Sequence, residues 1–171
     1  MPCINQVDEV KLLGVYLTNT FASTAHVNHL LTIGNQRLFL LSQLKNQGLA
    51  LDSLHIVYQA IIQSKLTYAL PAFAGQLTAM DITRFDALAR KAKRRGLAKT
   101  IPSMSEIIED HDESLFKRMR DSSHCLHHLL PPVRPNTLGR LRPRGHPYTL
   151  PQINFKQHKL SFPTRCLFSN I

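Results

Sequence analysis

The chain has 171 residues, 43% of them apolar, and a formal net charge of +10 at neutral pH. This composition excludes wholesale disorder, and the length excludes a large enzyme. No run approaches the roughly 20 apolar residues that a membrane span needs, and no secretory signal is recognisable. Three scattered cysteines, Cys3, Cys125 and Cys166, do not form a disulfide framework. We therefore expect an intracellular protein, nuclear or cytoplasmic.

The first predicted element is a short strand near residues 10–18. Leu13, Val15 and Leu17 alternate with more polar positions at period two, which is typical of a half-buried strand. Gly14 within the run indicates a bulge or the close approach of another backbone. An isolated strand pair is marginal in water, so we expect these three side chains to be poorly buried.

From Ser23 onward the apolar residues recur at spacings of three and four, which predicts helices. The first predicted helix ends at Gly48, and the second runs from an N-cap at Asp52 to Pro71. A third begins near Thr78. A capping-box sequence, Ser103 to Glu106, opens a fourth that reaches Met119 or continues to Leu130. The expected core residues are Leu54, Ile61, Phe85, Leu88 and Phe116.

Beyond residue 131 the sequence loses its helical period. Residues 131–151 contain six prolines, two glycines and four arginines, which predicts an irregular segment. Two later apolar patches, residues 153–155 and 161–168, are expected to dock on the helices. The predicted fold is a mainly α-helical bundle with a short N-terminal strand or hairpin and an irregular Pro/Arg-rich tail. The predicted segments are 1–21, 22–130 and 131–171.

Positive charge is concentrated in two parts of the chain. Residues 84–99 carry seven basic and one acidic side chain, and residues 122–171 carry seven basic and no acidic ones. Such clusters indicate a polyanionic partner, most often nucleic acid, although they also serve simply to solvate a helical surface. The candidate phosphate-binding residues are Arg84, Lys91, Arg94 and Arg95, with Arg140, Arg142 and Arg144 as a second patch.

Catalytic patterns are weak in this sequence. The histidines and cysteines lack the C-x₂₋₄-C pair that usually marks a structural zinc site. His111 and Glu113 form an H-x-E pattern, but on the predicted helix two residues apart means about 200° apart, so both cannot hold one metal. The acidic residues of the first 83 positions do not pair as a two-metal site requires. We expect no enzyme activity, no metal and no cofactor.

Several stretches together resemble the C-terminal region of reverse transcriptases encoded by non-LTR (LINE-like) retrotransposons. They are "VKLLGVYLTNTFASTAHVNHLL", "NQRLFLLSQLKNQGL", "AIIQSKLTYALPAF" and the terminal series "HCLHHLLPP", "LRPRGHPYTLP" and "KLSFPTRCLF". Their order covers nearly the whole chain. In that family a catalytic palm with a Tyr-Ala-Asp-Asp turn precedes the Lys-x-Leu-Gly strand, and here "KLLG" begins at Lys11 with no Asp-Asp motif anywhere in the chain.

The resemblance implies a strand that helps seat the primer, followed by a helical thumb, without the palm or its catalytic aspartates. We therefore interpret the chain as a truncated, non-catalytic remnant that binds RNA or DNA duplexes weakly through phosphates, with Lys11 as a further contact. One alternative is a helical protein-interaction module. Another is a fragment related to the N-terminal region of alkylation-repair dioxygenase homologues, without dioxygenase activity.

Overall fold

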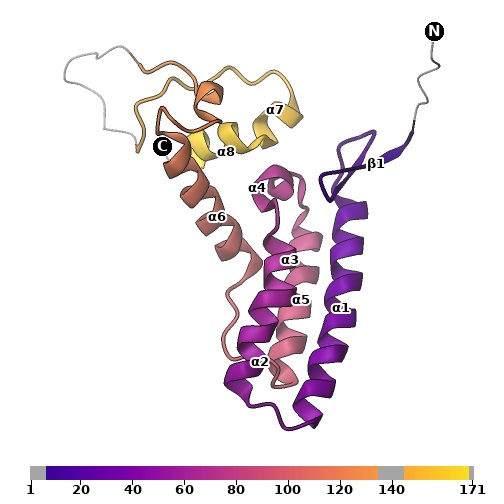
Figure 1. Ribbon diagram of the computed structural model, residues 1–171. Coiled ribbons are helices and arrows are strands. Elements are labelled where there is room, and N and C mark those ends of the chain that lie inside the picture. Colours follow the sequence, from indigo (N-terminus) through magenta and orange to yellow (C-terminus); the bar gives the residue numbers. More distant parts are fainter. Residues whose placement is uncertain (1–6, 135–144, 170–171) are drawn as a thin grey trace. The chain divides into compact units, whose positions relative to one another are not determined.

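The computed structural model describes residues 7–134 and 145–169 (Figure 1). The chain divides into two compact units, Met1–Ile107 and Ile108–Ile171, which we describe separately. The division falls within helix α6 (Met104–Met119), so it differs from the composition-based segments of the sequence analysis. The predicted fold class, mainly helical with a short N-terminal hairpin, is confirmed.

The first unit begins with a β-hairpin rather than one strand. Strands β1 (Glu9–Leu12) and β2 (Val15–Thr18) pair antiparallel, with Leu12 opposite Val15. Leu13 and Gly14 form the two-residue turn with φ values of 46° and 87°, and two positive φ values match the twist of a tight hairpin. Gly14 therefore makes a turn, not a bulge within a strand.

Burial of the hairpin is uneven. Leu13 is 83% exposed, as expected for a turn, but Val15 is only 8% exposed. The expectation of poor burial is therefore wrong for Val15. The reason is that β2 packs on the following helix, α1, which supplies the apolar surface that an isolated hairpin lacks.

Helix α1 (Thr24–Asn46) follows the predicted pattern. Its buried face is formed by residues at helical spacing, including Val27, Leu30, Leu38 and Leu41. Gly48 adopts a φ of 90° and ends the helix as predicted. Such left-handed glycine caps satisfy carbonyls that a helix end leaves without partners, and here Leu49 N donates to Leu44 O at 3.1 Å.

The second predicted helix is interrupted. Helix α2 (Leu51–Tyr58) passes into a π-helical turn, η1 (Gln59–Gln63), then α3 (Ser64–Thr67), α4 (Leu70–Phe73) and a 3₁₀ turn, η2 (Ala74–Gln76). Ala50, not Asp52, is the N-cap of α2. The helix is interrupted before Pro71, at Ala69, whose φ is 54°.

The π-helical turn changes which isoleucine is buried. Ile62 is fully buried, whereas Ile61 is only partly buried. The choice of Ile61 as a core residue is therefore wrong. A π turn holds one more residue per hydrogen-bonded ring than an α turn, so the 3.6-residue period read from upstream positions selects the neighbouring residue.

Helix α5 (Ala79–Arg94) begins at the predicted position with a complete capping box. Thr78 Oγ1 accepts from Asp81 N at 3.1 Å, and Asp81 Oδ2 accepts from Thr78 N at 3.1 Å. Phe85 and Leu88 are buried as predicted. With Leu54, Tyr58 and Phe73 from the preceding elements, they form the core of the first unit.

In the first unit the long elements lie alongside one another (Figure 1). The short connections make successive elements antiparallel, so the α2–α3 segment runs against α1, and α5 again runs in the direction of α1. The first turn of α6 also belongs here. Asp86 Oδ1 on α5 accepts from Met104 N at 2.8 Å, and the predicted capping box at Ser103 and Glu106 forms.

The second unit contains most of α6 with η3 (His127–Leu129), α7 (Lys156–Leu160) and α8 (Phe162–Ser169). Its small core consists of Phe116, Tyr148, Cys166 and Leu167. Phe116 is thus buried as predicted, but in a different core from Phe85. Helix α6 ends at Met119, so the possible continuation to Leu130 is not formed.

Helix extends further toward the C-terminus than the predicted irregular tail allowed. Residues 145–155 contain no helix, whereas α7 and α8 follow them. The apolar patch 161–168 docks as expected through Cys166 and Leu167, but Phe155 of the other patch is 72% exposed. Among the described helices, not one combines the length and the apolar character that crossing a bilayer requires.

Candidate nucleic-acid interface

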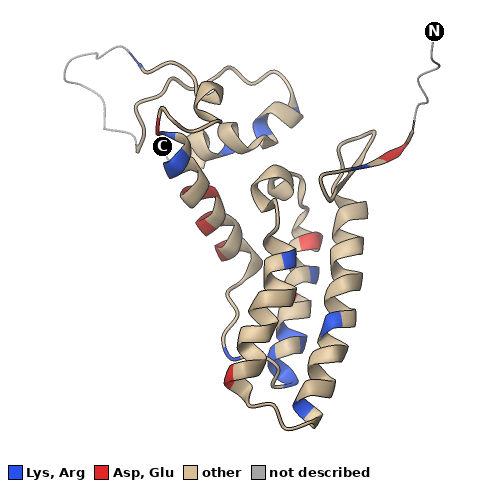
Figure 2. Ribbon diagram, in the orientation of Figure 1, with Lys and Arg blue, Asp and Glu red and all other residues tan. Residues whose placement is uncertain are grey.

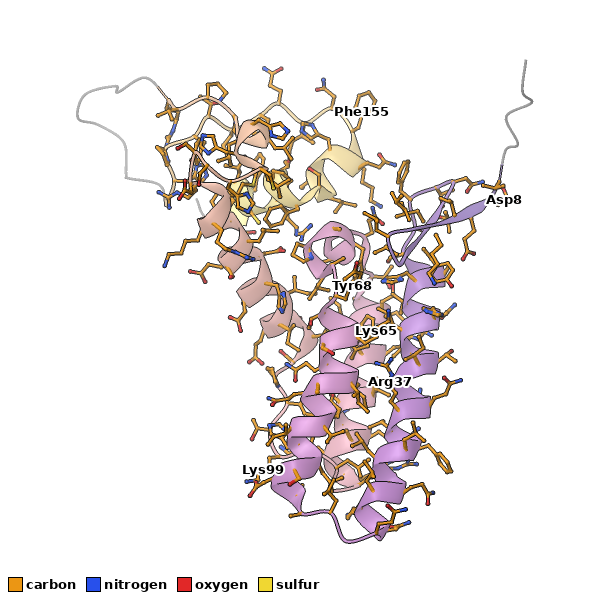
Figure 3. The ribbon with its side chains drawn as sticks, viewed as in Figure 1. Asp8, Arg37, Lys65, Tyr68, Lys99 and Phe155 are labelled. Atoms are coloured by element: carbon orange, nitrogen blue, oxygen red, sulfur yellow. The ribbon has the colours of Figure 1, made fainter. Side chains whose placement is uncertain are left out.

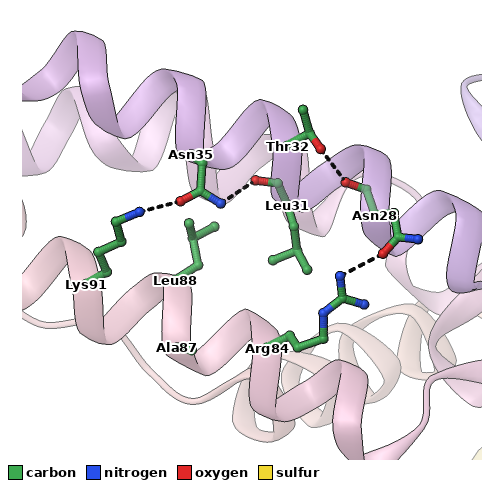
Figure 4. Close-up of a pocket in the computed structure, with 8 residues that line it drawn as sticks. All are labelled: Asn28, Leu31, Thr32, Asn35, Arg84, Ala87, Leu88 and Lys91. Carbon is green, nitrogen blue, oxygen red and sulfur yellow. Dashed lines mark hydrogen bonds between the residues drawn. The ribbon is translucent and has the colours of Figure 1, made fainter.

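Arg84 and Lys91, two of the predicted phosphate contacts, lie seven residues apart on one face of α5. This spacing places them two turns apart, about 10.5 Å along the helix axis. Both line a groove between α1 and α5 (Figure 4). We call this the Asn–cation groove, and its lining residues are Asn28, Leu31, Thr32, Asn35, Arg84, Ala87, Leu88 and Lys91.

The two cations hydrogen-bond to neutral amides of α1. Arg84 Nη2 donates to Asn28 Oδ1 at 2.7 Å, and Lys91 Nζ donates to Asn35 Oδ1 at 2.7 Å. In each of the two pairs, the residues are 56 positions apart in the sequence. A constant offset of this kind is expected for two helices that run in the same direction. An amide oxygen satisfies a donor without cancelling its charge, so the groove keeps its positive potential.

One carboxylate lies near this groove. Asp81 Oδ1 is 3.5 Å from Arg84 Nη1, a long contact for a charged pair. Asp81 is buried and its other oxygen, Oδ2, is used by the capping box of α5. Arg84 is therefore only partly neutralised, and its side chain is 39% exposed.

The floor of the groove depends on a glycine. A Cβ added at Gly34 of α1 would lie 2.6 Å from Leu88 Cδ2 of α5, so any side chain there would require Leu88 to move. The absence of a side chain at Gly34 lets the two helices approach. This close approach brings the asparagines of α1 within reach of the cations of α5.

Arg94 and Arg95 lie outside this groove, at the C-terminal end of α5, where both are exposed. Figure 2 shows basic residues gathering toward that end, including Lys91 and Lys93. Lys45 of α1 donates to Arg95 O at 2.6 Å and adds a further charge. Cations at a helix C-terminus also favour the helix dipole, so stability accounts for part of this clustering.

Lys11 lies on the hairpin, where its ammonium is 5.3 Å from the ring centroid of Tyr16. The sequence prediction named it as a further contact, and among the described residues no hydrogen bond or ion pair joins it to α5. Arg140, Arg142 and Arg144 lie outside the described residues. The structure thus brings together Arg84 and Lys91, with Arg94 and Arg95 at the same helix's end.

The start of α1 carries two histidines in a cationic environment. His26 is buried, and Tyr16 N donates to its Nδ1 at 3.4 Å. Burial lowers the pKa of His26 to about 4, with smaller contributions from His29 and Lys65. Burial also lowers the pKa of His29, and the charges of Lys11 and Lys65 add to this effect.

Sequence reasoning missed the asparagine partners and Lys45. Asn28 and Asn35 share the seven-residue spacing of Arg84 and Lys91, and this matched spacing is the signal that could have found them. Within the described part of the chain, no cluster of three or more His, Cys, Asp or Glu side chains could hold a metal ion. His111 and Glu113 both lie on α6.

Comparison with known proteins returned no significant match to any family model, curated protein or solved structure.

Proposed function

We propose that this chain is a non-catalytic remnant of a non-LTR retrotransposon reverse transcriptase, retaining weak, sequence-independent affinity for RNA or DNA duplexes. The proposal rests on the sequence resemblance and on one observation: Arg84 and Lys91 occupy one groove with neutral amide partners. It assigns the chain no catalytic step and no cofactor. The exposed Arg94 and Arg95 extend the same basic helix.

Phosphate binding needs positive charges that are accessible and not cancelled by carboxylates. Residues 84–99 carry seven basic side chains and one acidic one. Arg84 has a long contact with Asp81 and Lys99 pairs with Asp52, and the other cations of the segment meet both conditions. Contacts of this kind position a duplex but do not read its sequence. If four to six phosphates are engaged, the log–log salt slope of the association constant is roughly −4 to −5, with a Kd no tighter than about micromolar.

The test is a titration of labelled primer–template duplex at two salt concentrations. The triple variant Lys91→Glu, Arg94→Glu, Arg95→Glu should bind at least tenfold more weakly and show a shallower salt slope. The matched control reverses three exposed cations at and just beyond the end of α6 and changes the net charge equally: Lys117→Glu, Arg118→Glu, Arg120→Glu. Equal affinity of the wild type and the α5 variant, or equal losses in both variants, would overturn the assignment to α5.

A second candidate function is a helical protein-interaction module. Its supporting observation is the exposure of large apolar side chains on unit 1 helices: Phe39 at 60%, Leu40 at 55% and Ile56 at 64%. Scattered apolar residues are common on protein surfaces. The duplex titration separates the two proposals, because a purely protein-binding module would show no salt-dependent binding of nucleic acid.

A further inference from the structure

A second groove in the first unit combines an exposed aromatic ring with two cations. It lies where the hairpin turn meets α1 and α3, and we call it the tyrosine groove. Figure 3 labels three of its side chains, Arg37, Lys65 and Tyr68. Its lining residues are Leu13, Gly14, Arg37, Ser64, Lys65 and Tyr68.

The ring of Tyr68 is held in place yet accessible. Its hydroxyl donates to Leu13 O in the hairpin turn at 3.1 Å. A Cβ added at Gly14 would lie 3.4 Å from Tyr68 Cε1, so the turn backbone also packs against the ring edge. Tyr68 is nevertheless 50% exposed. A tyrosine buried for packing alone would not present half of its surface to solvent.

Two cations line the groove together with this ring. Lys65, three residues earlier, places its ammonium 5.6 Å from the ring centroid. Arg37 of α1 reaches across the groove and donates through Nη1 to Ile61 O in the π-helical turn. Within the described residues, neither cation has a carboxylate partner. A guanidinium has five N–H donors, so Arg37 keeps donors beyond the one that it uses.

Positive potential also converges on this end of the unit from neighbouring groups. Lys11 and Lys65 both act on His29, whose pKa is lowered first by burial and then by these two charges. Asp8, just before the hairpin, accepts a hydrogen bond from Asn19 Nδ2 at 3.0 Å. The groove is therefore an aromatic platform in a cationic setting.

We propose that the tyrosine groove binds single-stranded nucleic acid, with one base stacked on Tyr68 and the adjoining phosphates beside Lys65 and Arg37. Stacking platforms flanked by cations are the usual means of binding single strands without reading sequence. A base within a duplex is already stacked, so this groove discriminates against duplexes. The site is independent of the Asn–cation groove and goes beyond the duplex binding assigned to it.

The test compares two strands of equal length and phosphate number, an oligothymidine and its abasic counterpart, with the full chain. The wild type should bind the base-bearing strand about tenfold more tightly, as expected for one stacked base. Tyr68→Leu should abolish this difference, and Tyr68→Phe, which keeps the ring, should retain it. Lys65→Gln should lower the salt slope on both strands by about 1.

A fluorescence measurement keeps the proposal testable if Tyr68→Leu fails to fold. The chain contains no tryptophan, so the Tyr68→Trp variant carries a single reporter in the groove. Its emission should be quenched by the base-bearing strand and not by the abasic strand. Equal affinity of the wild type for both strands, or unchanged emission, would overturn the proposal and leave phosphate contact alone.

Two variants test the two proposed nucleic-acid sites separately. The α5 variant Lys91→Glu, Arg94→Glu, Arg95→Glu should lose duplex affinity but keep its preference for the base-bearing strand. Tyr68→Leu should keep the duplex affinity of the wild type. If the α5 variant loses the preference for bases as well, the tyrosine groove is not an independent site.

Discussion

In the first unit the cations Arg84 and Lys91 bind neutral asparagines, whereas in the second unit Arg165 binds a carboxylate. Arg165 Nε and Nη2 donate to Asp112 Oδ2 and Oδ1 at 2.6 and 2.7 Å. The two side chains are only 17% and 14% exposed. Arg165 thus holds α8 on α6, whereas Arg84 and Lys91 keep positive charge available to a ligand.

The two units also differ in the size and composition of their cores. The first unit buries long aliphatic and aromatic side chains from several helices, among them Leu38, Tyr58 and Phe85. The second has a small apolar cluster, supplemented by a buried histidine. His146 Nε2 donates to Leu167 O at 2.8 Å, while Tyr148 N donates to its Nδ1 at 3.2 Å.

The strongest test of the apolar core is Phe85→Ala. Phe85 is 2% exposed, and truncation of a buried phenylalanine costs about 3–5 kcal/mol. Chemical denaturation followed by circular dichroism should show this loss. The control Thr83→Ala, at an exposed position of α5, should change stability by less than about 0.5 kcal/mol. An unchanged denaturation midpoint for Phe85→Ala would mean that α5 does not contribute to the core.

Removing the carboxylate of the ion pair should open the second unit. Asp112→Ala removes the carboxylate that faces the largely buried Arg165, and we expect a loss of about 2–3 kcal/mol, below the range for fully buried pairs because both groups keep some exposure. Burial raises the pKa of the Cys166 thiol to about 12, so the wild-type thiol should react slowly with alkylating reagents.

The readout is the alkylation rate of Cys166 relative to exposed Cys125. Asp112→Ala should raise it roughly 30-fold, the equivalent of about 2 kcal/mol. The control Asp110→Ala, at an exposed position of the same helix, should leave the rate unchanged. A slow rate in Asp112→Ala would show that the apolar cluster alone closes the second unit.

One polar group in the first core makes stability depend on pH. The pKa of His26 is lowered from 6.5 to about 4 in the folded protein, so the unfolded chain binds a proton that the folded chain rejects. His26 therefore costs little stability above about pH 6.5, and the free energy of unfolding decreases as the pH falls toward 4. Between pH 7.5 and pH 5 the loss is about 2 kcal/mol.

Denaturation midpoints at pH 7.5 and 5 measure this effect. His26→Gln keeps an acceptor for Tyr16 N without a titrating group, so its stability should vary less over the same interval. A wild type and a variant with the same pH dependence would assign the effect to other groups.

The smallest effect should come from the ion pair between Lys99 and Asp52 on the first unit. Their side chains are 49% and 74% exposed, and exposed pairs contribute about 0–1 kcal/mol. Lys99→Ala should therefore shift the thermal midpoint by no more than a degree or two. A larger shift would mean that this exposed ion pair contributes substantially to the stability of the first unit.

The sequence predicted the helices where local signals were strong. Thr78, Ser103 and Gly48 each end or begin a helix at the expected position, because caps depend on a few neighbouring residues. The sequence allowed a strand or a hairpin near residues 10–18, but it did not locate the turn, because Leu13 and Gly14 lack the Asn or Asp typical of such turns and Gly14 was interpreted as a bulge. Turn geometry there is fixed by the strand pairing and by the contact with α1.

The candidate site was only half predictable. The basic face of α5 follows from periodicity, but its partners Asn28 and Asn35 are 56 residues away, and no local pattern encodes such a contact. The tyrosine groove was missed for the same reason. Its parts come from the hairpin, α1 and α3. The buried pair of Arg165 and Asp112, 53 residues apart, is a third example.

The π-helical turn at Gln59–Gln63 shifts the apolar repeat of the sequence by one residue between α2 and α3. It does so because it holds one residue more than the corresponding α turn, while the helical segment continues in nearly the same orientation. Deleting one residue from Gln59–Gln63 should therefore convert the turn into regular α-helix and leave Tyr68 at the hairpin turn. Loss of base-dependent binding in such a deletion variant would show that the π turn itself positions Tyr68.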